Sequence, residues 1–243
     1  RERYHRHLVL SEFGVAGQER LKAAKVLVVG GGGLGSAASL YLAAAGVGTL
    51  ALVDFDKVDL SNLQRQVLYG SADIGRSKAL RGQARLQELN PDISIVAHDC
   101  EVTAGNVMDL IRPYHLVVDG TDRLSTRYQV NDACVLQRKM LVSAAIHRFE
   151  GQTFSYVPEC GPCYRCIFPS AGEGVTPNCA EAGVLGVLPG ILGTVQATEA
   201  IKLLAGFGEP LIGRLLTVDA LTMRFDEFKV TRRADCAVCG DQP

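Results

Sequence analysis

A glycine-rich turn between two apolar runs constrains the fold of this chain more than any other feature. Lys25–Val29 is short, apolar and rich in Val, which is typical of a strand buried on both faces. The letters GGGGLG at Gly30–Gly35 contain G-x-G-x-x-G, and the helix formers of Leu34–Ala45 follow. A second apolar run, Thr49–Val53, ends at the acid Asp54. This order predicts a nucleotide site, because a turn without Cβ atoms lets phosphate approach a helix N-terminus and the acid then meets a ribose. The alternative is a glycine turn that serves only close helix–sheet packing.

Composition narrows the class of protein. The 243 residues are 47% hydrophobic and 21% charged, which is ordinary for a globular protein with one large α/β domain or two small ones. Lys and Arg number 25 against 26 Asp and Glu, so no nucleic-acid or membrane surface is indicated. No apolar run reaches the roughly 18–20 residues that span a bilayer, and no signal peptide is visible. We therefore expect a cytoplasmic protein.

Strand-like and helix-like stretches alternate as far as Ala145, which predicts an α/β fold with a Rossmann-like, mainly parallel sheet and helices on both faces. The expected strands are Ile93–Ala97, His115–Asp119 and Met140–Ala145, and the expected helices are Gly75–Leu89 and Leu124–Arg138.

From Gly151 the pattern changes to C-terminal strands that we expect to be antiparallel. We expect one domain over residues 1–243, with a nucleotide-binding core at 25–150 and a second part at 151–243. The strands of that part are Gln152–Val157, Leu215–Asp219 and Met223–Val230, with a core helix at Val195–Leu204.

The stretch Asp54–Gly70 is too polar for a core element, yet it follows the strand that ends at the expected ribose acid. Loops beyond the carboxyl ends of parallel strands form the ligand crevice, so Arg65 is expected to reach phosphate. Lys78 falls in the first turn of the next helix, where a cation opposes the helix dipole unless an anion lies nearby. The alternative is an ordinary solvated loop.

Two acids, Asp119 and Asp122, stand at the carboxyl end of a buried strand. Such a pair suits Mg²⁺, which takes one or two carboxylates together with phosphate oxygens. The alternative is that Asp122 caps the helix that follows it.

Four of the eight cysteines form two C-x-x-C pairs about 70 residues apart, Cys163 with Cys166 and Cys236 with Cys239. Two such pairs predict a closed, four-thiolate zinc site that fastens the C-terminus to the middle of the chain. The alternative, a redox pair, is disfavoured because neither pair opens a thioredoxin-like βα unit. Cys179 lies outside both pairs, and it is either a low-pKa nucleophile or a small core residue.

Eight stretches together resemble the ThiF/MoeB family, the bacterial relatives of the ubiquitin-activating enzymes, in the short form without a rhodanese domain. They run through nearly the whole chain in the family's order. The stretches are RYHR at Arg3–Arg6, GGGGLG at Gly30–Gly35, DFDKVDLSNLQRQ at Asp54–Gln66, GRSKA around Lys78, DGTD at Asp119–Asp122, the paired C-x-x-C motifs, and CAEAGVLG at Cys179–Gly186.

The resemblance implies a function. The family uses ATP and Mg²⁺ to adenylate the C-terminal glycine of a ubiquitin-fold sulfur carrier that ends in Gly-Gly, releasing pyrophosphate before a sulfur donor acts. Molybdopterin biosynthesis is the expected pathway, and the thiamine-thiazole carrier is the alternative. Two other classes stay open: an NAD-dependent oxidoreductase, which leaves Arg65 and Lys78 unexplained, and a non-catalytic, zinc-stabilised module that binds the carrier.

The resemblance also implies residue roles. Asp54 would hold the ribose, Asp122 would support Mg²⁺, and Arg6 would reach the phosphates of the partner subunit across a homodimer. Arg123 departs from the Asn that many relatives carry there. The expected nucleotide-binding residues are Gly30, Gly32, Gly33, Gly35, Asp54, Asp56, Ser61, Asn62, Leu63, Gln64, Arg65, Lys78, Asp122 and Arg123. The expected catalytic residues are Arg6, Arg65, Lys78, Asp122 and, if it takes part, Cys179.

Overall fold

The structure of the chain is a computed structural model that describes residues 2–169 and 183–241. Its centre is an eight-stranded sheet in the order β3-β2-β1-β4-β5-β6-β7-β8. The first five strands in sequence are parallel, and the last three continue the sheet in antiparallel pairs. The strands are β1 (Lys25–Val29), β2 (Thr49–Val53), β3 (Ser94–His98), β4 (Leu116–Asp119), β5 (Met140–His147), β6 (Glu150–Tyr156), β7 (Arg214–Asp219) and β8 (Arg224–Lys229).

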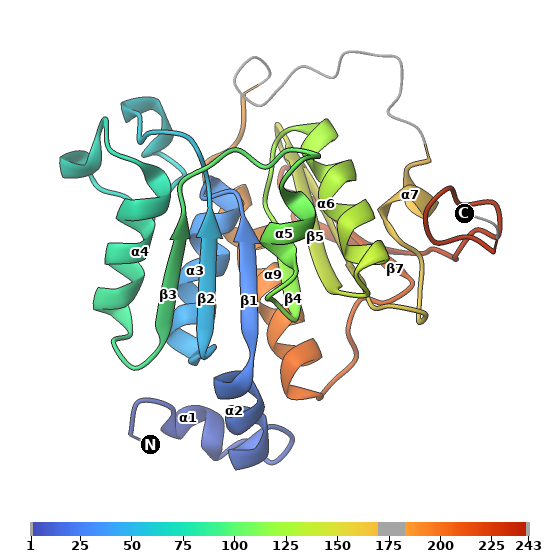
Figure 1. Cartoon of the computed structure of the whole chain (residues 1–243), viewed down its shortest axis with the longest axis horizontal. Coiled ribbons are helices and arrows are strands. Elements are labelled where there is room, and N and C mark those ends of the chain that lie inside the picture. The colour runs from blue at the N-terminus through green and yellow to red at the C-terminus, as the bar shows by residue number, and fades with distance from the viewer. Residues whose placement is uncertain (1, 170–182, 242–243) are drawn as a thin grey trace.

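Helices cover both faces of the sheet, as Figure 1 shows, and the expected fold class is confirmed. One buried cluster joins α3, α4 and α9 to Val26 and Val28 of β1, while a second joins α5 and α6 to Leu27 and Val29. Alternate residues of one strand thus enter opposite cores, as the period of a strand requires. The helices are α1 (His5–Leu8), α2 (Gly14–Ala23), α3 (Gly33–Ala45), α4 (Lys78–Leu89), α5 (Val107–Ile111), α6 (Leu124–Leu136), α7 (Tyr164–Ile167) and α9 (Leu188–Ala205), with short 3₁₀ turns η1 (Leu60–Asn62) and η2 (Ser71–Asp73).

Helix α4 begins at Lys78, three residues later than the sequence predicted. The cause is local: the Ser77 side chain accepts the backbone N–H of Leu80 at 3.3 Å and so caps the helix. Lys78 is therefore the first residue of the helix, beside the loop that follows β2.

The strand order reverses between β1 and β4. From β1 the chain builds outward through β2 and β3, then returns to place β4 and β5 on the other side of β1. Ligands of open α/β sheets bind at such a reversal, beyond the carboxyl ends of the strands. The loops after β1, β2 and β4 therefore surround the expected nucleotide site.

The N-terminal segment lies at the other edge, where the parallel strands begin (Figure 1). Tyr4 packs on Gly46, where a Cβ atom would lie 2.6 Å from the Tyr4 ring, and Gly46 has a φ of +88°. The Tyr4 hydroxyl accepts a hydrogen bond from Asn90 at 2.8 Å, and Arg3 donates to the carbonyl of Leu89 at 3.0 Å. These contacts fix the position of α1. Among the described helices, none combines the length and the hydropathy needed to cross a membrane.

Candidate active site

The glycine turn after β1 has the geometry that its spacing predicted. Gly30 has a φ of +89° and donates its N–H to the carbonyl of Val53 at 2.9 Å. A Cβ atom on Gly35 would stand 1.8 Å from the Gly30 carbonyl oxygen, so only glycine fits at the start of α3. Gly32 is the N-cap of that helix, and Gly33 faces Pro189 of α9 so closely that a Cβ atom would lie 2.8 Å away.

Asp54 holds this turn at the end of β2. Its two carboxylate oxygens accept the N–H groups of Gly31 at 2.7 Å and Asp56 at 2.8 Å. A carboxylate offers about four lone-pair sites, so acceptor capacity remains for ribose hydroxyls. Burial raises the pKa of Asp54, and the nearby charge of Lys78 opposes that rise.

Lys78 is almost fully buried beside this acid, with 4% of its surface exposed. Its Nζ pairs with Asp56 at 3.0 Å, while its backbone N–H donates to the carbonyl of the same residue at 2.9 Å. Asp56 is half exposed, so the ammonium is held at the edge of the site by a partner that solvent reaches. A cation in this environment is screened less than one in water, and it can act strongly on phosphate.

The polar loop that follows lies against the glycine turn. Asp59 accepts both the N–H and the hydroxyl of Ser61, at 2.8 and 2.6 Å, and Arg65 donates to the Ser61 carbonyl at 3.0 Å. Asn62 reaches the Ser61 hydroxyl at 3.4 Å, so these side chains are ordered by their own loop. Gln64 packs against Gly186, and Leu63 packs partly buried against the core.

The acid that ends β4, Asp119, and the acid in the turn after it, Asp122, behave differently, so the expectation of a paired carboxylate site is wrong. Asp119 is fully buried and hydrogen-bonded to protein groups, which removes it as a metal ligand. Asp122 is exposed, and its carboxylate has no hydrogen bond or ion pair with residues in the described ranges. The capping alternative is also wrong, because the N-cap of α6 is Arg123 and no side chain caps that helix.

The guanidinium of Arg123, the residue after Asp122, is paired with groups from other loops. Its guanidinium pairs with Glu101, Nη1 to Oε1 at 2.5 Å, and its Cζ lies 4.8 Å from the centre of the Phe55 ring. The positive charge that Arg123 adds is therefore balanced by Glu101 from the loop after β3.

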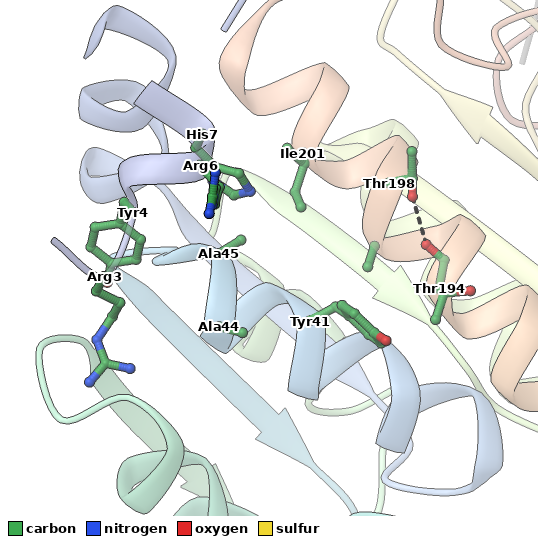
Figure 2. A pocket seen from close by; sticks show the side chains of 11 residues that line it. Arg3, Tyr4, Arg6, His7, Tyr41, Ala44, Ala45, Thr194, Thr198 and Ile201 are labelled. Atoms are coloured by element: carbon green, nitrogen blue, oxygen red, sulfur yellow. Dashed lines mark hydrogen bonds between the residues drawn. The ribbon is translucent and has the colours of Figure 1, made fainter. Parts of the chain in front are cut away.

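Arg6 is not near these residues. It lines a cavity of about 430 Å³ between the N-terminal segment, α3 and α9, at the edge where the parallel strands begin (Figure 2). Tyr41 of α3 and Thr194 and Thr198 of α9 line the same cavity. Within one chain, the structure does not bring Arg6 to Asp54, Lys78 or Asp122.

The four cysteines of the paired C-x-x-C motifs meet, as expected. Their Sγ atoms all lie within 4.8 Å of one another, with Cys163 to Cys236 at 3.7 Å and Cys166 to Cys239 at 3.3 Å. Tetrahedral zinc with Zn–S bonds of about 2.3 Å places sulfur atoms about 3.8 Å apart, so the donor set fits zinc. Among these thiols, burial raises the pKa of Cys163 and of Cys239, whereas at Cys236 hydrogen bonds from the backbone of Cys239 and Val238 outweigh burial and lower the pKa. Cys179 falls outside the described residues.

Comparison with known proteins decides the family. The ThiF family model matches residues 4–238, which is nearly the whole chain. The chain belongs to the ThiF family. A sulfur carrier protein adenylyltransferase of Thermus thermophilus is 50% identical over 100% of this chain and 92% of its own length. The SAMP-activating enzyme E1 of Haloferax volcanii is 49% identical over 99% and 89%.

Other members of the ThiF family are longer than this chain. Mouse adenylyltransferase and sulfurtransferase MOCS3 is 52% identical over 99% of this chain but 53% of its own length. Among solved structures, Escherichia coli MccB with ATP aligns with a TM-score of 0.87 at 24% identity, covering 98% of this chain and 73% of that one. That likeness concerns the fold alone.

Sequence reasoning missed the residues that support the ThiF glycine turn from behind. Tyr69 donates its hydroxyl to the Gly31 carbonyl at 3.0 Å, and Ser36 reaches the same oxygen at 3.2 Å. Burial, together with the charge of Asp54, raises the pKa of Tyr69, so the hydroxyl keeps the proton that it donates. Gln66 is buried beside Gly32. Gln66 and Tyr69 lie at the end of a polar stretch, and no local sequence pattern shows that they are buried while their neighbours are solvated.

Proposed function

We propose that this chain uses ATP to adenylate the C-terminal glycine carboxylate of a small ubiquitin-fold sulfur carrier that ends in Gly-Gly. Relatives named for this activity match nearly the full chain at about half identity. The observation that carries the proposal is the buried Lys78 ammonium, held by Asp56 beside the Asp54-bound glycine turn at the carboxyl edge of the sheet. The alternative of an NAD-dependent oxidoreductase assigns no role to that cation.

The reaction joins two anions. A carboxylate oxygen of the carrier attacks the α-phosphorus of ATP, the bond from that phosphorus to the bridging oxygen breaks, and pyrophosphate leaves. Lys78, Arg65 and Asn62 would neutralise and orient the phosphates, because fixed cations and donors lower the cost of charge that develops in the transition state. The N–H groups of the glycine turn would contact phosphate, and Asp54 would hold the ribose.

Asp122 would hold Mg²⁺ on the phosphates. Its exposed carboxylate without a described partner suits an ion that takes one or two carboxylates and completes its shell with phosphate oxygens and water. When bound, Mg²⁺ supplies charge neutralisation to the pyrophosphate leaving group. Arg123, paired with Glu101, would form the wall beside this acid.

We propose a homodimer in which Arg6 acts in the site of the partner subunit. Helices α3 and α9 both begin near the glycine turn, where Gly33 meets Pro189, and both end near the N-terminal segment. A two-fold axis across this pair of helices would set Arg6 of one subunit beside the glycine turn of the other. Tyr41 and Val187 lie on α3 and at the start of α9, and they are 58% and 64% exposed, which supplies apolar surface for such a contact.

The cysteine cluster would hold a structural zinc ion. Four thiolates leave no open position, so the ion would stabilise residues 151–243, the proposed carrier-binding part, rather than react. Molybdopterin biosynthesis is the proposed pathway and the thiamine-thiazole carrier is the second candidate; in both, a sulfur donor would replace AMP on the carrier.

ATP–pyrophosphate exchange measured with a panel of purified carriers tests the function. We expect exchange only with a matching carrier and none with the same carrier lacking its last glycine. Binding of every carrier without exchange would favour a binding module, and reduction of NAD⁺ without any carrier would favour an oxidoreductase. The carrier with the highest kcat/KM would identify the pathway.

A further inference from the structure

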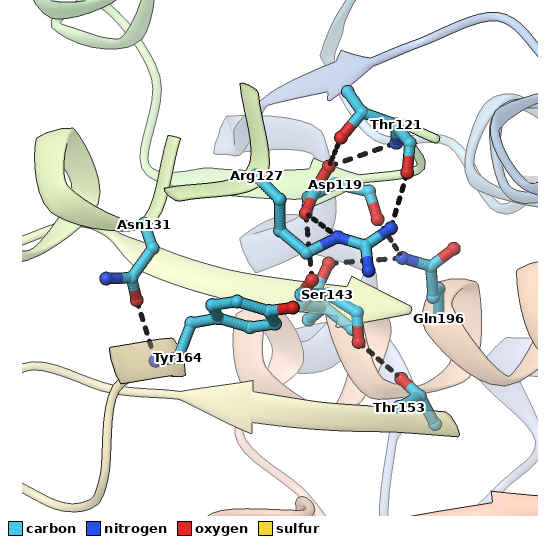
Figure 3. A network of polar contacts seen from close by, with 9 residues as sticks. Asp119, Thr121, Arg127, Asn131, Ser143, Thr153, Tyr164 and Gln196 are labelled. Atoms are coloured by element: carbon cyan, nitrogen blue, oxygen red, sulfur yellow. Dashed lines mark hydrogen bonds and ion pairs between the residues drawn. The ribbon is translucent and has the colours of Figure 1, made fainter. Parts of the chain in front are cut away.

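A buried polar network surrounds Asp119, the last residue of β4 (Figure 3). The Asp119 side chain is 1% exposed. One carboxylate oxygen accepts the N–H of Thr121 at 3.0 Å and its hydroxyl at 2.7 Å. The other accepts the hydroxyl of Ser143 at 2.8 Å and lies 3.5 Å from Nε of Arg127. Both oxygens of this carboxylate are therefore committed to the protein.

The same network closes the turn that leads to Asp122. Arg127 of α6 donates from Nη2 to the carbonyl of Thr121 at 2.5 Å, so Thr121 is held from both its N–H and its carbonyl. Gln196 of α9 is fully buried and donates to the carbonyls of Asp119 at 2.7 Å and Val142 at 3.2 Å. Three elements, α6, α9 and β5, thus fix the turn.

The turn at residues 119–121 packs against the glycine turn after β1. Gly120 donates its N–H to the carbonyl of Val29 at 2.9 Å. A Cβ atom on Gly30 would lie 3.2 Å from the Gly120 carbonyl oxygen, so the two turns are packed face to face. A shift of residues 119–121 would move Asp122 relative to the glycine turn.

Stability alone is a weak reason for this arrangement. Burying a carboxylate and a guanidinium costs desolvation, and replacing a buried ion pair by apolar groups is often neutral or stabilising. The ion pair and its hydrogen bonds instead fix the orientation of the backbone that carries Asp122.

We infer that Asp119 is a positioning residue that, through Arg127, Ser143 and Thr121, holds Asp122 in its orientation toward the metal–nucleotide complex. The inference rests on the proposed function, in which Asp122 supports Mg²⁺. Partners that orient a ligand are typically worth about 10-fold or more in metal affinity, although they touch neither metal nor substrate.

The chain supplies a matched pair of variants for the test. Ser143 on β5 donates to Asp119 at 2.8 Å, and Ser155 on β6 donates to Glu199 at 2.9 Å. Both serines are buried, at 2% and 0% exposed, and both serve a buried carboxylate. Only the first of these carboxylates borders the turn that carries Asp122. Glu199 instead joins α9 to the N–H of Leu211.

The experiment measures melting temperature and the equilibrium binding of ATP by calorimetry over a range of free Mg²⁺. Ser143→Ala and Ser155→Ala should lower the melting temperature by similar amounts, because each loses one buried hydrogen bond. Only Ser143→Ala should raise the Mg²⁺ concentration for half-maximal ATP binding, by about 10-fold, and Arg127→Lys should raise it at least as much.

An equal Mg²⁺ requirement in Ser143→Ala and Ser155→Ala would overturn the positioning role and leave the proposed function intact. If wild-type protein bound ATP with no dependence on Mg²⁺, the proposed role of Asp122 would fail, and this inference would fail with it.

Discussion

The central strands of the sheet and its C-terminal end, β7 and β8, are stabilised in different ways. In β1 and β2 all residues after the first are buried, and β4 is buried throughout, between two layers of helices. In β8 no residue is buried, and in β7 only Val218 is. These central strands are held by a two-sided core, whereas the β7–β8 end has little apolar burial of its own and lies next to the cysteine cluster.

The residues of the expected nucleotide site lie on or beside the well-packed central strands, whereas the thiol cluster lies beside the sparsely packed end of the sheet. Asp54 and Asp122 follow well-packed strands and Lys78 begins a helix packed on them, so the core resists small displacements of these residues. The end of the sheet bears the exposed Phe225 and Phe228, and it is joined to the rest by the β6–β7 ladder and by a cluster of four thiols from two distant motifs. Perturbing the two parts should therefore have different consequences.

Removing zinc should have the largest effect. Protein purified anaerobically should carry about one zinc per chain, and Cys236→Ala should lose it together with several kcal/mol of stability, because metal binding and folding are coupled. Hydrogen exchange should show lost protection in α7, β7 and β8 while β1, β2 and β4 stay protected. Cys160→Ala, at an exposed cysteine outside the cluster, is the control. Zinc-free protein with full protection would contradict the prediction.

Lys78→Met should cause a large loss of activity while the fold stays intact, in contrast to zinc removal. Carrier-dependent exchange should fall by about 100-fold to 1,000-fold, because a cation on the phosphates is lost. The melting temperature should change little, since Met fills the buried space and the abandoned Asp56 is half exposed. Lys57→Met, at an exposed lysine in the loop after β2, should keep its activity. A similar loss in both variants would show that the loop, rather than the buried ammonium, matters.

Mixing two inactive variants tests whether the nucleotide site on the central strands needs Arg6 from the partner subunit. Arg6→Ala and Asp122→Ala should each be nearly inactive, and an equal mixture should recover roughly a quarter of wild-type activity, because half of the dimers are hybrids with one intact site. Subunit exchange is verified by native mass spectrometry. No recovery after verified exchange would show that Arg6 does not act in trans.

The pH dependence of ATP binding should show a smaller effect, from Asp54. Burial raises the pKa of this acid above its usual 3.8, so in the free protein its ionisation costs stability as the pH rises from 3.8 through the folded pKa. The ionised form keeps acceptor capacity for ribose hydroxyls beyond its bonds to Gly31 and Asp56, whereas a protonated oxygen loses part of that capacity. ATP affinity should therefore fall as the pH drops through the raised pKa.

Binding titrations in wild type and Asp54→Asn check this prediction. The variant should bind ATP more weakly and lose the titration step. The same pH profile in both proteins would assign the step to another group.

The sequence was informative wherever a function depends on neighbours along the chain. The glycine spacing, the apolar run before it and the acid at Asp54 predicted a turn whose geometry Gly30 and Gly35 confirm. The two C-x-x-C pairs predicted a cluster that the structure contains, because each pair presents two thiols at one turn and two such pairs make a tetrahedral donor set for zinc. Element types were confirmed, and boundaries moved where a side chain such as Ser77 capped a helix.

Only the tertiary structure separated residues with the same local pattern. Asp119 and Asp122 are two acids in one short motif, yet the first is enclosed by Arg127, Ser143 and Thr121 and the second faces solvent. Likewise, Arg6 reads as one more charged N-terminal residue until the packing of Tyr4 on Gly46 fixes it at the edge opposite the nucleotide turn. Local sequence determined the turns, strands and thiol pairs because their geometry is set by adjacent residues. Burial and partner choice were decided by the fold, because they depend on side chains far away in sequence.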